Sequence, residues 1–270
     1  MTEEQTPPKD FDTLRARIIA AHPLMPKRLA EIAAFALERP DDIALGTAAS
    51  IAAKTGFQPS SLIRFAQSLG FDGFSALQDL FRERLRGRVL SYEERLAHLD
   101  QAKESALLEG FSAAARASLD GLTERIDTAT LTRAVSMLAA AETIYLAGFR
   151  RAFPLTSAMA YGFGKLGVRC QLLGTGAGLE AGIIALAQPQ DAVFAVSFAP
   201  YAPETIAIAE LARARTIPLI AMTDSPLSPL AKLASLWFEV VEADFAGFRS
   251  LAASFALAST LTVAVAEHRR

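Results

Sequence analysis

The spacing of apolar residues changes partway along the 270-residue chain. Up to about residue 130, apolar residues such as Leu29, Ile32 and Ala36 recur at intervals of three and four, which is the period of an amphipathic helix. After Glu142, short β-rich apolar runs alternate with helical segments. This alternation is typical of parallel sheets, because two parallel strands require a crossover connection. The chain is therefore expected to hold an all-α part followed by an α/β part.

The α/β part is expected to contain a five-stranded parallel sheet with helices on both faces, a three-layer αβα arrangement. The predicted strands cover residues 143–147, 168–173, 192–198, 218–222 and 236–241. The predicted helices cover residues 153–166, 178–187, 203–214, 228–234 and 247–268.

The length of the chain predicts two domains, because a single hydrophobic core stops growing within a few hundred residues. Residues 1–90 are assigned to a helical domain, 91–108 to a helical connector and 109–270 to the α/β domain. The segment 91–108 is charged and helix-forming, which is why the connector is placed there. Residues 110–141 are expected to supply two helices that pack against the first strand.

The composition excludes several classes of protein. A net charge of −2 gives no overall attraction to nucleic acid, so a DNA-binding surface would need local Lys and Arg residues. The single cysteine, Cys170, excludes an internal disulfide and fits a reducing cytoplasm, and the three dispersed histidines predict neither a metal site nor a cofactor. The longest apolar run, 251–266, is too short to cross a bilayer, so no membrane partner is expected.

Residues 47–71 have the spacing that a helix-turn-helix motif requires. Ala52 is small where two helices must approach closely, and Gly56, four residues later, suits a turn with positive φ. Leu62, six residues further on, supplies the apolar contact between the helices. Pro59 fits the first turn of the second helix, where its missing N–H removes no hydrogen bond.

The second helix of this motif is expected to be a DNA recognition helix, because the residues at its start face base edges in such motifs. Between Lys54 and Phe71 no acidic residue occurs that would repel a polyanion. The predicted DNA-binding residues are Lys54, Gln58, Ser60, Ser61 and Arg64. The later arginines, between 82 and 88, are interpreted as a solvated helix face. The alternative for the whole motif is a helical hairpin that serves packing alone.

From Ile51 to Phe74 the chain resembles the N-terminal domain of RpiR-type regulators. Where that family has a recognition helix of the form VSPATVSRFAKRLGF followed by a Gly-Phe pair, this chain reads FQPSSLIRFAQSLGF followed by Gly73-Phe74. The residues that match directly are Arg64, Phe65, Leu69, Gly70 and Phe71. The resemblance implies that the α/β part is a SIS domain, a sugar-isomerase-like module, and the strand pattern from Thr143 onward is similar to that fold.

The resemblance also implies a phosphosugar site in two loops, and this chain departs from the usual residues in both. After the first strand, SIS domains typically carry G-x-G-x-S, whereas residues 148–152 read GFRRA, with Ala152 in the serine position. After the third strand the usual S-x-S-G-x-T-x-E becomes SFAPYAPE over residues 197–204, with Ala199 and Ala202 in place of hydroxyl-bearing residues. Each lost hydrogen bond to a charged phosphate removes roughly 1.5–3 kcal/mol.

Arginine side chains can compensate for the lost hydroxyls. Arg150 or Arg151 can pair with a phosphate or a carboxylate through two parallel hydrogen bonds, and the alternative is that they are surface or interface residues. Thr223, Asp224 and Ser225 follow the fourth strand, at the edge where open α/β sheets bind ligands, and are expected to form walls of the pocket. The predicted effector-binding residues are Gly148, Arg150, Arg151, Ser197, Tyr201, Glu204, Thr205, Thr223 and Ser225.

The sequence thus predicts a transcriptional regulator of carbohydrate or other catabolic genes. Its expected partners are a double-stranded DNA operator, a small anionic metabolite such as a phosphosugar or a carboxylate, and further copies of the chain in a homodimer or higher homo-oligomer. Two alternatives remain. The chain could be a SIS-domain sugar-phosphate isomerase, for which Glu204 is the candidate base, or a metabolite-binding adaptor that does not bind DNA. No catalytic residue is predicted for a regulator.

Overall fold

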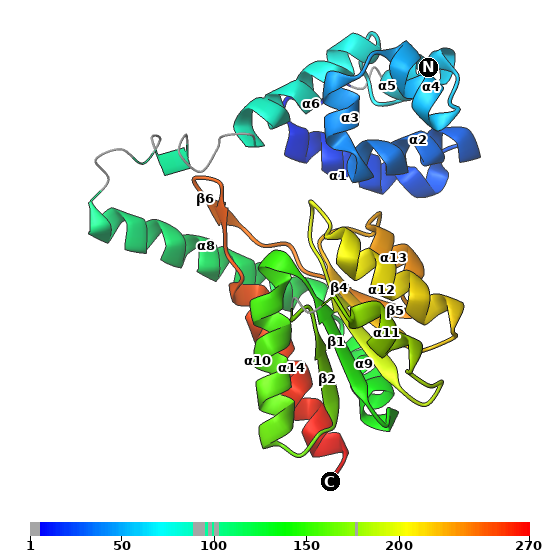
Figure 1. Cartoon of the computed structure of the whole chain (residues 1–270). Helices are drawn as coiled ribbons and strands as arrows, with labels where there is room; N and C mark the ends of the chain where they lie inside the picture. Colours follow the sequence, from blue (N-terminus) through cyan, green and yellow to red (C-terminus); the bar gives the residue numbers. More distant parts are fainter. Residues whose placement is uncertain (1–5, 89–94, 97–98, 100–102, 176–177) are drawn as a thin grey trace. The chain divides into compact units, whose positions relative to one another are not determined.

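A computed structural model describes residues 6–88, 95–96, 99, 103–175 and 178–270 of the chain. The chain divides into two compact units, Met1–Asp100 and Gln101–Arg270 (Figure 1). Half of the predicted connector, 91–108, lies outside the described residues, and the part from Glu104 onward belongs to the first helix of the second unit. Each unit has its own buried core.

The described part of the first unit is helical throughout. It comprises α1 (Phe11–Ala21), a short 3-10 turn η1 (His22–Leu24), α2 (Lys27–Glu38), α3 (Pro40–Leu45), α4 (Ala48–Thr55), α5 (Pro59–Ser68) and α6 (Phe74–Arg88). Asp10 caps α1 by accepting a hydrogen bond from the Thr13 backbone N–H at 2.7 Å. Large apolar side chains from α1, α2, α3, α5 and α6 are fully buried together, including Leu14, Ile32, Ile43, Leu62, Phe65 and Phe81.

The second unit is built on a parallel sheet whose strands lie in the order β2-β1-β3-β4-β5. The strands are β1 (Ile144–Gly148), β2 (Cys170–Leu173), β3 (Ala192–Val196), β4 (Leu219–Thr223) and β5 (Leu236–Glu239). All neighbouring pairs are parallel, with Ile144 opposite both Cys170 and Ala192. This arrangement confirms the predicted five-stranded sheet.

Helices cover both faces of this sheet, as the αβα prediction required (Figure 1). On one face lie α9 (Thr128–Ala140), α10 (Phe153–Lys165) and α14 (Ala252–His268), with α8 (Glu104–Arg125) packed against α14. On the other lie α11 (Glu180–Ala185), α12 (Pro203–Ala214) and α13 (Pro229–Leu233). A 3-10 turn, η2 (Arg150–Ala152), leads from β1 into α10.

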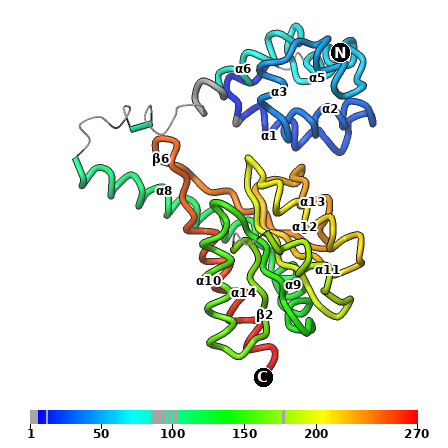
Figure 2. Tube along the Cα trace, in the orientation of Figure 1, coloured from blue at the N-terminus to red at the C-terminus, as the bar shows by residue number. Residues whose placement is uncertain are grey.

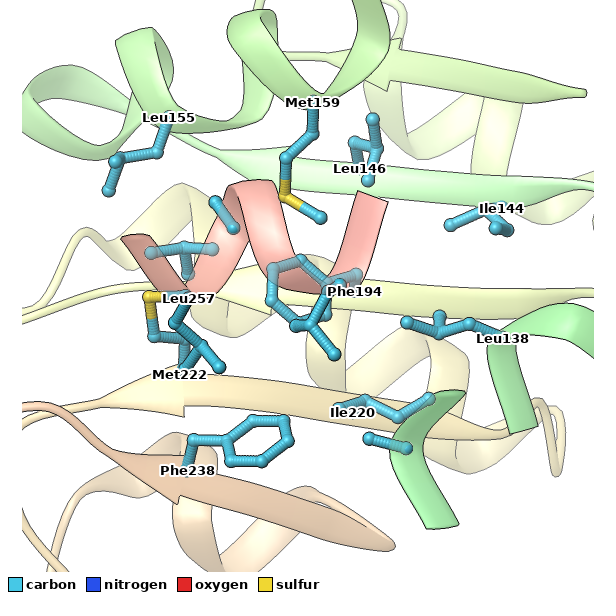
Figure 3. Close-up of a cluster of buried hydrophobic side chains, with 14 of the residues drawn as sticks. Leu138, Ile144, Leu146, Leu155, Met159, Phe194, Ile220, Met222, Phe238 and Leu257 are labelled. Atoms are coloured by element: carbon cyan, nitrogen blue, oxygen red, sulfur yellow. The ribbon is translucent and has the colours of Figure 1, made fainter. Parts of the chain in front are cut away.

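Alternate residues of each strand supply the two cores, because successive strand side chains point to opposite faces. Leu146, Phe194 and Met222 face α10 and α14 (Figure 3), whereas their neighbours Ala147 and Ala195 face the α12 side. The central strands β1, β3 and β4 are buried along their whole length. This explains why they read as continuous apolar runs in the sequence.

The last predicted helix, 247–268, begins later than expected. Residues before Ala252 form a two-stranded antiparallel hairpin, β6 (Asp244–Phe245) and β7 (Phe248–Arg249). The two residues between the strands, Ala246 and Gly247, have φ values of 50° and 81°. Positive φ at both positions is the geometry of a tight type I′ hairpin turn, which turns the chain back before the helix starts.

Candidate functional sites

The helices α4 and α5 form the predicted helix-turn-helix. Thr47 and Ser50 cap α4 reciprocally: each backbone N–H donates to the other side-chain oxygen, at 2.8 Å and 3.1 Å. Gly56 ends α4 with a φ of 73°, and a Cβ there would meet nothing within 4 Å, so its backbone conformation and not lack of space favours glycine. Pro59 is the first residue of α5.

The two faces of α5 differ sharply in polarity. Leu62, Phe65 and Ala66 are buried in the core of the first unit. Gln58, Ser60 and Arg64 are exposed, and Ser61 is half-buried. The polar side chains at the start of α5 are therefore available to a partner, and the apolar ones fix the helix to its own unit.

The cationic side chains around this motif differ in their interaction partners. Lys54 pairs with both oxygens of Asp42, at 2.8 and 2.9 Å, so its charge is already partly balanced. Arg28 of α2, which the sequence spacing did not reveal, donates to the carbonyl of Gly56 at 3.2 Å and lies 5.7 Å from the ring centroid of Phe57. Arg28 thus places a further positive charge beside the turn. Among the cations after the motif, Arg84 pairs with Asp41 at 2.9 Å.

In the second unit, the order of the strands marks one candidate crevice for a ligand. The connection after β1 leads to β2 on one side, and the strands after β3 continue on the other, so the order reverses between β1 and β3. Open α/β sheets bind ligands at the carboxyl ends of the strands at such a reversal. Gly148 ends β1 and Ser197 follows β3, so both predicted loops border this crevice.

An ion pair joins these two loops. The Arg150 Nη2 atom lies 2.9 Å from Glu204 Oε1, and the two side chains are 63% and 44% exposed. Glu204 stands in the first turn of α12. Its own backbone N–H and the Arg150 guanidinium both hydrogen-bond the carboxylate and lower the pKa of Glu204 below its ordinary value.

A family model described as the SIS domain matches residues 137–266, which include the whole sheet. The second unit is a SIS domain. The chain is similar to an uncharacterized HTH-type transcriptional regulator of Thermotoga maritima, with 24% identity over 203 residues, 75% of this chain and 72% of the relative.

Two solved structures share the fold. The sugar isomerase domain of an RpiR transcription factor from Sphaerobacter thermophilus has a TM-score of 0.56 and 23% identity, covering 62% of this chain and 92% of that one. The Vibrio vulnificus NanR protein complexed with ManNAc-6P has a TM-score of 0.57 and 22% identity, covering 94% of this chain and 92% of that one. The likeness to the NanR structure extends over both the helical unit and the SIS domain of this chain.

The loop after β1, residues 148–152, departs from the usual G-x-G-x-S at a position with an unusual backbone conformation. Arg150 occupies the second glycine position of G-x-G-x-S and has a φ of 56°. This left-handed conformation is favourable for glycine and unfavourable by roughly 1–2 kcal/mol for other residues. Residue 150 thus has a backbone conformation that favours glycine, although it carries a charged side chain.

Several predicted effector residues hold the loops of the SIS domain together. Ser197 Oγ accepts from the Ala202 N–H at 3.0 Å, and Thr223 Oγ1 donates to Ser228 Oγ at 2.8 Å. Ser225 Oγ accepts from the Leu227 N–H at 3.2 Å. Thr205 is fully buried, and its hydroxyl has no hydrogen-bond partner among the described residues. The hydroxyls of Ser197, Thr223 and Ser225 therefore stabilise the crevice walls.

The remaining predicted side chains lie nearer to solvent. Arg151 is exposed and its guanidinium carbon lies 5.7 Å from the ring centroid of Phe198, within reach of a cation–π interaction. Tyr201 is half-buried in the loop after β3. Arg150 and Arg151 thus place two cations after β1, and Phe198 and Tyr201 place two aromatic rings in the loop after β3.

Of three further charged residues at this edge, the sequence predicted only Asp224, as a wall of the ligand pocket. Arg249 of β7 donates to the Ala199 carbonyl at 3.1 Å and lies 3.7 Å from Asp224, which accepts from the Ala199 N–H at 3.1 Å. Glu242 accepts from both the backbone N–H and the hydroxyl of Ser254 at 2.8 Å. Asp224 and Glu242 follow β4 and β5, so their position at strand ends was a usable signal. Arg249 gave none, because its segment reads as helix.

A groove of about 250 Å³ lies elsewhere in the SIS domain, between α10 and α14. Its lining is mostly apolar or small, with Met159, Phe255 and Val263 among the lining residues, and includes none of the predicted effector residues. Within the described part of the chain, no group of three metal-binding side chains occurs. No helix of those residues is long and apolar enough to cross a membrane.

Proposed function

We propose that this protein is a transcriptional regulator that binds a double-stranded DNA operator through α4 and α5. The observation that carries the proposal is the division of α5 into a buried apolar face and an exposed face with Gln58, Ser60 and Arg64. Amide, hydroxyl and guanidinium groups at the start of such a helix can bond base edges and phosphates. The names of the relatives from Thermotoga and Sphaerobacter support the same role.

The proposed regulator acts as a homodimer or higher homo-oligomer. Dimeric helix-turn-helix proteins contact two half-sites about 34–36 Å apart, and the operator repeats its sequence with the symmetry of the protein. An effector changes DNA affinity only if it binds one arrangement of the domains better than another. The SIS domain supplies that difference.

The proposed effector is a small anion bound at the crevice between β1 and β3. Arg150 and Arg151 lie in η2, directly after β1, and a guanidinium can pair with either a phosphate or a carboxylate. The NanR structure was solved with ManNAc-6P, which supports a carbohydrate derivative as the ligand class. Regulation of carbohydrate or other catabolic genes follows from such a ligand.

Glu204 argues against an isomerase. Aldose–ketose isomerisation needs a general base with a pKa near the working pH. Glu204 pairs with Arg150 and its pKa is lowered, which makes its carboxylate a weaker base. The proposed role of Glu204 is to hold Arg150 until an anion replaces it.

The test is selection of genomic DNA fragments by the purified full-length protein over a range of salt concentrations. A shared inverted repeat, bound more weakly as salt rises, is expected, because phosphate contacts release counterions. Release of that repeat by pools of phosphosugars or of small carboxylates identifies the effector class. Absence of any enriched sequence at every salt concentration contradicts the proposal and favours the adaptor role.

The effector site is tested by the double substitution Arg150→Ala and Arg151→Ala. The variant is expected to bind the selected repeat as tightly as the unaltered protein and to lose the response to the active pool. Replacement of Arg133, an exposed arginine of α9, is the matched control and should leave the response intact. A retained response in the double variant removes both arginines from the site.

A further inference from the structure

The β6–β7 hairpin connects two parts of the SIS domain that are distant in sequence. At one end, Arg249 bonds the Ala199 carbonyl in the loop after β3 and lies near Asp224 in the loop after β4. The Arg249 and Asp224 side chains are only 25% and 13% exposed, so this interaction is shielded from solvent more than the Arg150 pair. Arg249 therefore fixes the hairpin to the loop that borders the proposed effector crevice.

The other side of the hairpin packs on α8 (Figure 2). The Phe111 ring of α8 lies 5.3 Å from that of Phe245 and 6.2 Å from that of Phe248, between ring centroids. The backbone N–H of Ala243 donates to the buried Ser118 hydroxyl of α8 at 2.9 Å. A Cβ on Gly110 would lie 2.4–2.6 Å from atoms of the Phe245 ring, so any larger residue at this position requires that ring to move.

From these contacts we propose that Arg249 is a positioning residue of the effector site, through which the loop after β3 and helix α8 move together. Packed side chains with this little free space transmit a displacement, because the alternative is a clash or an empty volume. An anion bound beside residue 199 competes with Asp224 for Arg249 and shifts the hairpin. The helix that responds, α8, includes the last residues of the predicted connector. The effector part rests on the proposed function, and the mechanical link does not.

The link is tested by hydrogen exchange of backbone amides in the full-length protein without DNA or effector. Arg249→Gln removes the charge from the hydrogen bond to the Ala199 carbonyl, so exchange in α8 around Gly110 is expected to rise by about tenfold or more. Arg249→Lys keeps the charge and should restore part of the protection. Arg213→Gln is the matched control, because Arg213 also donates to a backbone carbonyl, that of Lys232, on the other face of the sheet.

A second substitution tests the same link from the opposite end, because coupling between two sites is reciprocal. Gly110→Ala on α8 is expected to raise exchange at residues 199–202 several-fold by displacing Phe245. Gly121→Ala on the same helix is the control, since its Cβ would meet only the flexible end of Arg125. Both changes raise the helix propensity of α8 equally, so propensity cancels between them.

The two exchange experiments distinguish the proposed link from a general loss of stability. Increased exchange in α8 with Arg249→Gln, and in the loop after β3 with Gly110→Ala, supports the proposal. Two results overturn the proposal. If exchange changes only within the hairpin, the hairpin does not link the loop to α8. If exchange rises equally throughout β3 and β4, the substitution has lowered the stability of the whole domain. Neither readout involves DNA, so the result stands whether or not the protein proves to regulate transcription.

Discussion

The two proposed binding surfaces use their charged residues in opposite ways. On α5, Arg64 projects into solvent from a helix fixed by its own apolar face, and within the described structure no acidic side chain pairs with it. At the carboxyl edge of the SIS sheet, Arg150 pairs with Glu204 and Arg249 lies beside Asp224. Arg64 is therefore available to a polyanion, whereas an anion that binds Arg150 or Arg249 must displace partners that are already present.

This difference suits the two proposed tasks. DNA binding benefits from a preformed surface, because less ordering is needed when the complex forms. A sensing site benefits from internal competition, because a ligand that replaces an existing contact changes the protein around it, and only a ligand with unequal affinity for two arrangements shifts their populations. The comparison therefore predicts a rigid DNA-binding surface and a responsive effector edge.

The largest expected effect tests whether the two units are independent. Leu62→Ala empties a fully buried position in the first unit and should lower its free energy of unfolding by about 2–5 kcal/mol, with loss of operator binding. Trp237 in β5, the single tryptophan of the chain, reports unfolding of the SIS domain. Its fluorescence midpoint in urea is expected to stay unchanged. A matching shift of that midpoint contradicts independent units.

The same contrast explains what could be predicted from sequence. The helix-turn-helix depends on residues close together in the chain, such as Gly56, Pro59 and Leu62, so spacing alone located it. The sheet followed from continuous apolar strands. Arg249 and Arg28 could not be found in this way, because each meets its partner only after the chain has folded. The hairpin was missed because Ala246-Gly247 is a weak turn signal and the apolar residues after it favour a helix.

A second test compares two cations of the DNA-binding surface. Arg64→Ala should weaken binding to the selected operator by about 1–3 kcal/mol, as expected for loss of a base or phosphate contact. Lys54→Ala should weaken binding less, because the charge of Lys54 is already partly balanced by Asp42. The measurement is a titration of operator DNA at fixed salt. Equal losses would show that pairing within the protein does not limit Lys54.

The positive φ of Arg150 predicts a smaller effect, on the free energy of unfolding of the SIS domain. Arg150→Gly should be more stable than Arg150→Ala by about 1 kcal/mol, because glycine accepts a φ of 56° without the clash of a Cβ. At Arg151, whose φ is not positive, Arg151→Ala should instead be more stable than Arg151→Gly by about 0.5–1 kcal/mol. Urea unfolding followed through Trp237 measures both pairs. The same order at both positions contradicts the role of backbone strain.

The smallest effect concerns the pKa of Glu204, which the NMR titration of its carboxyl group measures. Arg150→Ala should raise this pKa only partway to its ordinary value, because the Glu204 backbone N–H is the larger cause of the lowering and remains. The pKa of Asp127, lowered chiefly by Thr130 at the start of α9, should not change and is the internal control. Since the pKa of Glu204 is lowered in the folded state, ionised Glu204 stabilises the fold at neutral pH, and this stabilisation is lost as the pH falls through that pKa.

An anion that draws Arg150 away from Glu204 should raise the pKa of Glu204, as Arg150→Ala does, whereas an anion that binds elsewhere should leave it unchanged. The titration therefore shows directly whether the ligand competes with Glu204 for Arg150.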